Sequence, residues 1–425
     1  MTNAPRKPFT HHDLLEWIDN RWKETLRSTP EDTPERFGLP RSYLVPCARE
    51  GFQDFFYWDT VFACMGLLTR GDPHVAYDSY LGIITLIKRF GYMPNAAKPS
   101  MLNRSQPPLL GALMAEIEDF CRTDRYVRED IGVLEQEYNF WMKERLLPCG
   151  LNHYGHNATD DYLYDFCGWC APRIHRDPPK TRQARLRLGA NLLAEAESGW
   201  DFNARFNHQA LDYAPVDLNA ILYGNEIRMA TWYGKFGERK KSEMFSELTR
   251  KRGELLHELC YSPKTGCFHD YNAKTKKQSP LVTAASYFPI WCYCCMRDED
   301  DLVNRMLAAL EEKLWTPYGV MATEKLPAGT VACQWDAPSI WPPLQIVALK
   351  ALKRVHRTKD AKRLAANFSE CVLRVFNETG DLWEKYDGFT GGICTANAEY
   401  GTPSMMGWTA AAYIICRDIV TSKEA

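Results

Sequence analysis

Apolar residues recur at helical spacing along almost the whole chain, and this pattern most constrains its fold. Near the N-terminus Leu14, Leu15, Ile18 and Trp22 share one helical face. The same period returns around Val75 to Leu86, around Leu109 to Phe120, and in later stretches at roughly 130–146, 183–196, 217–236, 240–259, 283–296, 299–311, 337–354, 359–376 and 404–420. The pattern predicts about a dozen helices and few strands.

The connections between these stretches are short and rich in Gly, Pro and Asn, and no low-complexity linker divides the 425 residues. A dozen helices in one uninterrupted chain favours an all-α fold, an (α/α)6 barrel whose loops at one end form a pocket. We therefore predict a single domain over 1–425, with 1–40 as an N-terminal helical extension. A stacked helical repeat is the competing architecture, but the chain has no fixed period of self-similarity.

The charge and the cysteine content of the chain limit the kinds of partner it can bind and the cellular compartment expected for it. The formal net charge of -2 gives no electrostatic reason to bind nucleic acid or an anionic membrane. No apolar stretch is long enough to span a bilayer, and the N-terminal residues lack the apolar core of a signal peptide. The 15 cysteines, an odd number, predict reduced thiols in a cytoplasmic protein. Cys167 and Cys170 have the spacing of a redox or metal pair but not the strand–helix context, so we expect no metal there.

Two clusters combine a carboxylate with aromatic rings. Asp201 follows Gly199 and Trp200, and Glu384 lies between Trp383 and Lys385. Hydrolysis of a glycoside needs one carboxyl group to protonate the leaving oxygen and another to activate water, while rings offer flat apolar faces to a sugar. Taken alone, Asp201 is equally well explained as a helix N-cap, and Glu384 is better explained as a surface glutamate.

Three further segments carry polar side chains that suit sugar hydroxyls. The first begins with Tyr57-Trp58-Asp59, and the second runs from Asn95 through Asn103-Arg104-Ser105-Gln106 to Pro108. The third runs from Gln334-Trp335-Asp336 to Trp341. The alternative for the second and third is a capping or turn segment with prolines at a helix start, which explains the prolines but not the dense group of donors.

In this order, these segments resemble the trehalase family of inverting glycoside hydrolases, from about Val45 to Thr409. The matching blocks include Arg104-Ser105-Gln106-Pro107-Pro108, Glu197-Ser198-Gly199-Trp200-Asp201-Phe202, Val216-Asp217-Leu218-Asn219-Ala220, Gln334-Trp335-Asp336-Ala337-Pro338, Glu384-Lys385-Tyr386-Asp387, Glu399-Tyr400 and Gly407-Trp408-Thr409. One such match alone is weak, whereas the ordered set is specific.

The resemblance implies an (α/α)6 barrel that needs no metal and no organic cofactor, with Asp201 as general acid and Glu384 as general base. An inverting mechanism would place these carboxyls about 6.5–9.5 Å apart to leave room for water. The expected substrate-binding residues are Tyr57, Trp58, Asp59, Asn95, Arg104, Gln106, Trp200, Gln334, Trp335, Asp336, Trp341, Glu399 and Trp408, together with the arginines Arg49 and Arg176. The expected partner is a small-molecule glycoside, and the protein is expected to be a monomer or a homo-oligomer.

Departures from the family pattern leave the leaving group open. Cys47-Ala48-Arg49 stands where the family has Gly-Gly-Arg, and the glycine-rich lid before Glu399 is reduced to residues 391–398. Trehalose hydrolysis is the main expectation. A hydrolase of another small α-glycoside, such as glucosylglycerate or mannosylglycerate, is the alternative, and a sugar-binding protein without turnover is a third reading.

Overall fold

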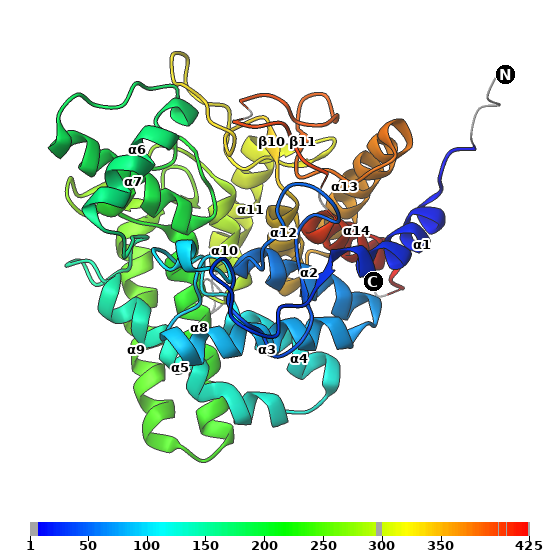
Figure 1. Cartoon of the computed structure of the whole chain (residues 1–425), viewed down its shortest axis with the longest axis horizontal. Coiled ribbons are helices and arrows are strands. Elements are labelled where there is room, and N and C mark those ends of the chain that lie inside the picture. Colours follow the sequence, from blue (N-terminus) through cyan, green and yellow to red (C-terminus); the bar gives the residue numbers. More distant parts are fainter. Residues whose placement is uncertain (1–6, 295–299, 398, 405, 424–425) are drawn as a thin grey trace.

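The computed structural model of the chain describes residues 7–294, 300–397, 399–404 and 406–423. Residues 1–6 of the expected extension, 295–296 and 299 of the expected helices, 398 of the reduced lid and 405 of the last expected helix lie outside the described residues. Within them the structure is mostly helical (Figure 1). Its α-helices are α1 (His11–Arg21), α2 (Tyr57–Arg70), α3 (Pro73–Phe90), α4 (Leu110–Cys121), α5 (Arg125–Glu144), α6 (Asp160–Cys170), α7 (Arg182–Ser198), α8 (Val216–Lys235), α9 (Arg239–Cys260), α10 (Tyr287–Trp291), α11 (Asp300–Leu314), α12 (Pro342–Arg354), α13 (Thr358–Thr379) and α14 (Gly407–Thr421).

Six helices form a closed inner ring. α2 contacts α4, α4 contacts α8, α8 contacts α10, α10 contacts α12, α12 contacts α14, and α14 returns to α2. The inner helices α2, α8, α12 and α14 are buried around most of their circumference, whereas the outer α9 is mostly polar and exposed. Gly66 allows α2 and α14 to approach closely, because an added Cβ would lie only 2.4 Å from the Ala411 Cα of α14.

The strands are short and connect the helix ends. Each has two residues and pairs antiparallel with its neighbour: β1 (Leu26–Arg27), β2 (Tyr43–Leu44), β3 (Tyr213–Ala214), β4 (Tyr261–Ser262), β5 (Cys267–Phe268), β6 (Tyr271–Asn272), β7 (Lys277–Gln278), β8 (Trp315–Thr316), β9 (Gly319–Val320), β10 (Ser339–Ile340) and β11 (Tyr386–Asp387). The pairing of β10 with β11 holds Ile340 opposite Tyr386, so the segment before α12 lies beside the segment that carries Glu384.

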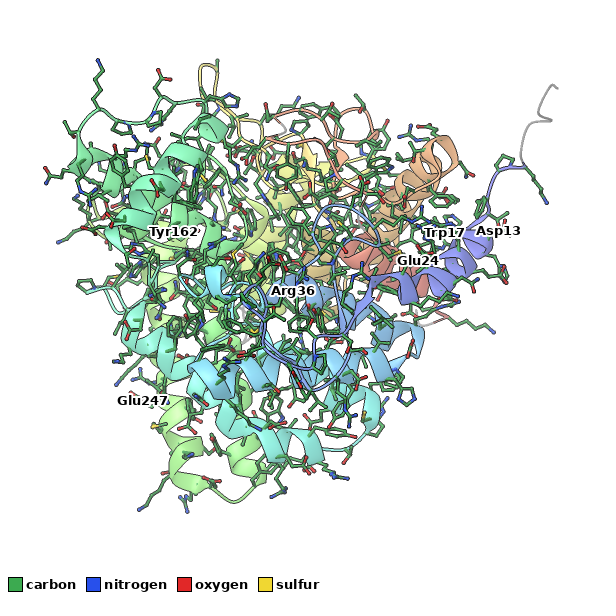
Figure 2. The ribbon with its side chains drawn as sticks, in the orientation of Figure 1. Asp13, Trp17, Glu24, Arg36, Tyr162 and Glu247 are labelled. Atoms are coloured by element: carbon green, nitrogen blue, oxygen red, sulfur yellow. The ribbon has the colours of Figure 1, made fainter. Side chains whose placement is uncertain are left out.

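The N-terminal residues pack on the barrel from outside. α1 begins with a capping box at Thr10 and contacts α14, and Trp17 packs against Phe376 of α13 with ring centroids 4.8 Å apart (Figure 2). After β1 the chain up to residue 40 has no regular element. The division into one domain over 1–425 with an extension over 1–40 stays a prediction. Within the described residues, no helix combines the length and the apolar character that crossing a membrane requires.

Several predicted helices have different bounds from those expected, and the one predicted over 130–146 begins at Arg125. α12 begins at Pro342 rather than near 337, because β10 and the loop before it occupy residues 337–341. The stretch predicted over 283–296 divides into a 3-10 turn at Ala284–Ser286 and the short α10. The helix predicted from 404 begins at Gly407.

Candidate active site

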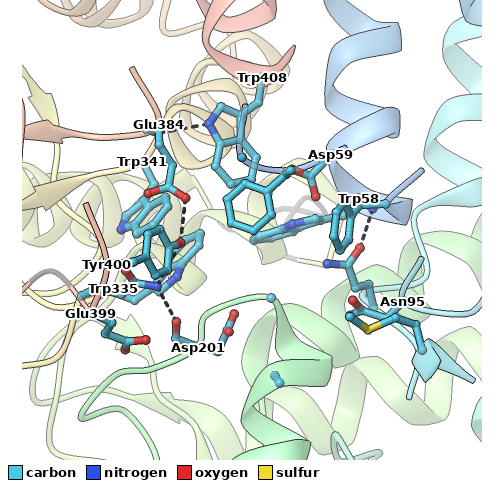
Figure 3. A pocket seen from close by; sticks show the side chains of 18 of the residues that line it. Trp58, Asp59, Asn95, Asp201, Trp335, Trp341, Glu384, Glu399, Tyr400 and Trp408 are labelled. Carbon is cyan, nitrogen blue, oxygen red and sulfur yellow. Dashed lines mark hydrogen bonds between the residues drawn. The ribbon is translucent and has the colours of Figure 1, made fainter. Parts of the chain in front are cut away.

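A cavity of about 620 Å³ opens at the end of the barrel where inner helices begin. Trp58 and Asp59 lie in the first turn of α2, Trp341 directly precedes α12, and Trp408 is the second residue of α14. Loops supply the other walls, among them Phe52, Phe56, Asn95, Met101, Arg104, Gln106, Arg173, Asp201, Gln334, Glu384, Glu399 and Tyr400. Figure 3 shows side chains from these separate segments turned toward one space.

Asp201 reaches the cavity because α7 ends just before it. Gly199 ends this helix with a φ of 78°, in the left-handed region that favours glycine, and an added Cβ there would lie 2.7 Å from the Trp58 ring. The Asp201 side chain is 33% exposed, and Arg173 Nη2 lies 3.4 Å from its Oδ2. Burial raises the pKa of Asp201, while the Arg173 and Arg104 guanidinium groups act in the opposite direction. The carboxyl group is therefore biased toward its protonated form.

Glu384 has a different set of partners. Its side chain is 1% exposed, its Oε2 accepts from Lys385 Nζ at 2.6 Å, and its Oε1 accepts from the Tyr400 hydroxyl at 2.7 Å. The Trp408 indole donates to the Glu384 main-chain carbonyl at 3.0 Å, which fixes the segment against α14. Burial raises the pKa of Glu384, and Lys385 and Tyr400 lower it. Both oxygens therefore have donors that favour the ionised form.

A third carboxylate, Glu399, shares an arginine with Asp201. Arg173 Nε donates to Glu399 Oε2, and the main-chain N–H of Phe202 donates to Glu399 Oε1 at 3.2 Å. Burial raises the pKa of Glu399 to about 8, although Arg173 acts to lower it. Arg173 thus contacts both Asp201 and Glu399 on this side of the cavity. It restrains Asp201 although it belongs to a different segment of the chain.

One wall of the cavity is a stack of indoles. Trp335 and Trp341 are parallel within 1° with ring centroids 3.7 Å apart, and Trp200 stacks on Trp335 at 5.5 Å. Trp408 meets the edge of Trp341 at 5.9 Å. This wall offers an apolar face of the kind on which a sugar ring packs.

The opposite wall comes from the loop before α4. Gln106 Oε1 accepts from the Trp58 main-chain N–H at 3.0 Å, and Asn95 Nδ2 donates to the Ser105 carbonyl at 3.0 Å. Arg104 lines the cavity, and its Nη1 donates to Asn103 Oδ1 at 2.9 Å. These bonds hold the loop so that its remaining donors point into the cavity.

Comparison with known proteins decides the family. The sequence profile of the family described as Trehalase matches residues 9–419. The chain belongs to the trehalase family. The periplasmic trehalase of Salmonella paratyphi B is 30% identical over 438 residues, which cover 98% of this chain and 75% of that protein. This finding confirms the family and the glycoside hydrolase class expected from the ordered motifs.

Solved structures confirm the helical barrel. Neutral trehalase Nth1 from Saccharomyces cerevisiae aligns with a TM-score of 0.72 at 23% identity, covering 90% of this chain and 74% of that one. A GH63 mannosylglycerate hydrolase from Thermus thermophilus aligns with a TM-score of 0.62 at 14% identity, covering 95% of this chain and 99% of that one. The predicted all-α (α/α)6 fold is therefore confirmed.

Five residues expected to bind substrate do not line the cavity. Tyr57, Trp200 and Asp336 are buried behind it: Tyr57 donates to Glu137 at 3.1 Å, and Asp336 accepts from the main-chain N–H groups of Ala204 and Cys333. Arg49 has a side chain that is 76% exposed and lies 3.8 Å from Glu24, and Arg176 is exposed. The first three support the walls, whereas the two arginines point to solvent. The other expected residues all line the cavity: Trp58, Asp59, Asn95, Arg104, Gln106, Asp201, Gln334, Trp335, Trp341, Glu384, Glu399 and Trp408.

Sequence reasoning missed several residues of this trehalase-family site. Arg173 lies three positions before Arg176, and the 3-10 turn Pro172–Ile174 brings it rather than Arg176 beside Asp201. Tyr400 follows Glu399 directly and was available from the same motif. No sequence pattern pointed to Phe52, Phe56 and Met101, because apolar residues in loops follow no regular spacing.

Metal-binding side chains are gathered elsewhere. Among the described residues one group, His12, Asp13 and Glu16, has donor atoms close enough to hold an ion, and it is exposed on α1. Cys167 and Cys170 are buried free thiols on α6. None of these five residues lines the cavity.

Proposed function

We propose that this protein hydrolyses α,α-trehalose to two glucose molecules with inversion at the anomeric carbon. The observation that carries the proposal is the convergence of Asp201 and Glu384, from loops far apart in the sequence, on one cavity with an indole wall. Membership of the trehalase family and the relatives named as periplasmic trehalases support it.

The two carboxyl groups differ in the way the mechanism requires. Glu384 accepts hydrogen bonds from Lys385 and Tyr400, which favour its ionised form, and in this proposal it is the base that removes a proton from water. Asp201, whose pKa is raised by burial, is the acid that donates a proton to the glycosidic oxygen as the bond to the anomeric carbon breaks. Water attacks from the face opposite Asp201, the leaving sugar departs with the Asp201 proton, and inversion follows.

The walls orient the substrate in this scheme. A glucose ring packs against Trp341 and Trp335, and its hydroxyls bond to Arg104, Gln106 and Asn95 on the other side. Arg173 and Glu399 restrain Asp201 near the glycosidic oxygen. Holding the reacting groups in place lowers the barrier by avoiding reorganisation during the reaction.

The experiment is proton NMR of the purified protein with trehalose, following the anomeric signals from the earliest minutes. Early appearance of β-glucose together with α-glucose supports inversion. Asp201→Asn is expected to abolish turnover while leaving sugar affinity largely intact, and Asp165→Asn, at an exposed position on α6, is the matched control. Full activity of Asp201→Asn would refute the acid assignment, and binding without turnover by the wild type would favour a sugar-binding protein.

A glycoside with an anionic leaving group is the second candidate. Arg104 lines the cavity and, among the described residues, is paired with no carboxylate, whereas Arg173 already contacts two. A guanidinium group in this position suits the carboxylate of a glyceryl glycoside. Glucose release from glucosylglycerate but not from trehalose would assign this substrate in the same NMR assay.

We further propose that the protein works in a reducing compartment, the cytoplasm. Apart from Cys294, thirteen cysteines of the described chain are free thiols, and eleven of them are buried. The alternative is a periplasmic location, which the names of the relatives favour. Fractionation of the source cells, with the activity assayed in each fraction, tests the proposal, and activity confined to the periplasm would refute it.

A further inference from the structure

A second cavity, of about 610 Å³, lies at the other end of the barrel. Its walls come from α4, from the C-terminal halves of α8 and α12 and from the end of α10, and they include Arg228, Trp291, Tyr293 and Arg354. α12 begins beside the catalytic cavity at Trp341 and ends at Arg354, and at about 1.5 Å per residue the two cavities stand roughly 20 Å apart. The second cavity is thus separate from the active site.

Arg228 is an unusual residue at this position. It lies in the interior of α8, and its side chain folds back over Gly224, where an added Cβ would lie 2.9 Å from Arg228 Nη1 and 3.2 Å from Cys292 Cβ. A glycine inside a helix lowers helix stability by about 1 kcal/mol relative to alanine. The helix is therefore less stable at the position that makes room for this guanidinium group. Within the described chain, Arg228 has neither an ion-pair partner nor a hydrogen-bond partner, and burial lowers its pKa.

Arg354 faces the same cavity from α12. Its guanidinium group lies 3.6 Å from the centroid of the Tyr293 ring and donates to the Tyr293 hydroxyl. Tyr293 has a φ of 66°, an uncommon conformation for a residue other than glycine. Burial and the charge of Arg228 both lower the pKa of Arg354, so the two cations repel each other across the cavity.

None of the described carboxylates at this end forms an ion pair with Arg228 or Arg354, although the charge of Glu116 acts on both. Glu116 accepts from Lys350 at 2.6 Å, Glu118 from Lys235 at 3.0 Å, and Asp119 from Arg122 at 3.3 Å. The cavity therefore holds two guanidinium groups without a direct ion-pair partner among the described residues, beside three carboxylates that pair with other cations. A purely structural role accounts for only one of them: Arg354 ends α12, where a cation stabilises the helix dipole, but Arg228 lies seven residues before the end of α8.

We propose that this cavity binds a phosphate group, as inorganic phosphate or as a small phosphomonoester. The two guanidinium groups offer paired N–H donors to a dianion, a geometry that suits phosphate. Trp291, Trp232 and Tyr293 line the remaining volume, which is larger than one phosphate needs and suits an organic group attached to it. Bound dianion would cancel the repulsion between Arg228 and Arg354.

Calorimetry on the full chain in phosphate-free buffer tests the site, with inorganic phosphate and phenyl phosphate as probes and phenol as the uncharged control. We expect one site per chain and weaker binding, by about tenfold or more, in Arg228→Gln and in Arg354→Gln, because each loses a charged hydrogen-bonding group. Lys353→Gln, which removes an exposed charge of the same helix, should bind like the wild type, as should Asp201→Asn. Tighter binding of phenyl phosphate than of phosphate would assign the ester as the natural class, and the reverse would assign the free ion.

Several results would overturn the proposal: no binding at millimolar concentrations, binding of chloride as tight as that of phosphate, or equal effects of Arg228→Gln and Lys353→Gln. A second measurement uses the wild type alone. Phenylglyoxal modification followed by mass spectrometry should label Arg228 and Arg354 more slowly when phosphate is present, with exposed Arg49 as the internal control. Unchanged labelling of both residues would also refute the site, whatever the trehalose assay shows.

Discussion

Lys385→Met is expected to move the acid limb of the pH–activity profile to higher pH. Lys385 is completely buried, and its ammonium group donates to Glu384 Oε2 at 2.6 Å. Its other neighbours are Gln334 Oε1 at 3.4 Å and the faces of Trp341 and Tyr400, so Glu384 is its one carboxylate partner within the described residues. Methionine is unbranched and one heavy atom shorter than lysine, and it removes the charge.

The size of the effect follows from the burial of the pair. A hydrogen bond to a charged group contributes about 1.5–3 kcal/mol, and solvent does not screen this one because the two side chains are 0% and 1% exposed. The base must be ionised to act, so removing the cation that lowers the pKa of Glu384 makes protonation easier and raises that pKa. At about 1.4 kcal/mol per factor of ten, kcat/KM on the acid side should fall about 10- to 100-fold.

The assay is kcat/KM for trehalose across the pH range, which reports groups of the free enzyme. Tyr400→Phe is the matched control, because it removes a neutral donor from the other oxygen of the same carboxylate. A neutral hydrogen bond contributes about 0.5–1.5 kcal/mol, so its acid limb should move less. An unchanged acid limb in Lys385→Met, or a larger shift in Tyr400→Phe, would refute the assignment of Glu384 as the base held by Lys385.

Three further perturbations have defined outcomes. Arg173→Gln removes the guanidinium that lowers the pKa of Asp201, so the loss of activity at alkaline pH should begin at higher pH and kcat should fall, while Arg176→Gln should match the wild type in the same profile. Arg205→Met leaves the buried carboxylates of Asp217 and Asp270, which the arginine contacts at 2.5 and 2.6 Å, without their cation. The free energy of unfolding, measured with denaturant, should fall by about 3–5 kcal/mol, and an unchanged value would mean that those carboxylates reach water. Gly66→Ala places a methyl group against the α14 backbone and should cost about 1–3 kcal/mol in the same measurement, whereas an unchanged midpoint would mean that the helices separate freely.

The helical fold could be predicted from the sequence because the spacing of apolar residues along a helix is visible in a single chain. Outer helices such as α13 alternate apolar and polar faces over 22 residues, so their period is clear. Inner helices such as α10 are buried all round and carry little period, which explains why the stretch over 283–296 was predicted as one helix. β10 and β11 are too short for alternation to show, although they hold the Glu384 segment in place.

The site was predictable where chemistry is local and not where it depends on loop paths. Asp201 and Glu384 lie in motifs whose residue types already suggest a carboxylate among rings. A single 3-10 turn decides whether Arg173 or Arg176 points into the cavity. The two residues are only three positions apart, yet Arg173 lines the cavity and Arg176 is exposed. Such a choice is made by tertiary packing, which a single sequence does not encode as a pattern.

The barrel also explains why its two ends suit different chemistry. At the catalytic end α2 and α14 begin with residues that line the cavity, and the positive dipole ends of these helices favour carboxylates in an otherwise costly environment. At the other end the inner helices present carbonyl groups and negative dipole ends, which favour cations such as Arg354. A dianion there must overcome that bias, so a single arginine at a helix end would not suffice. The mid-helix Arg228, placed over Gly224, supplies a charge that the helix ends do not require, and for this reason Arg228→Gln is the decisive variant for the second cavity.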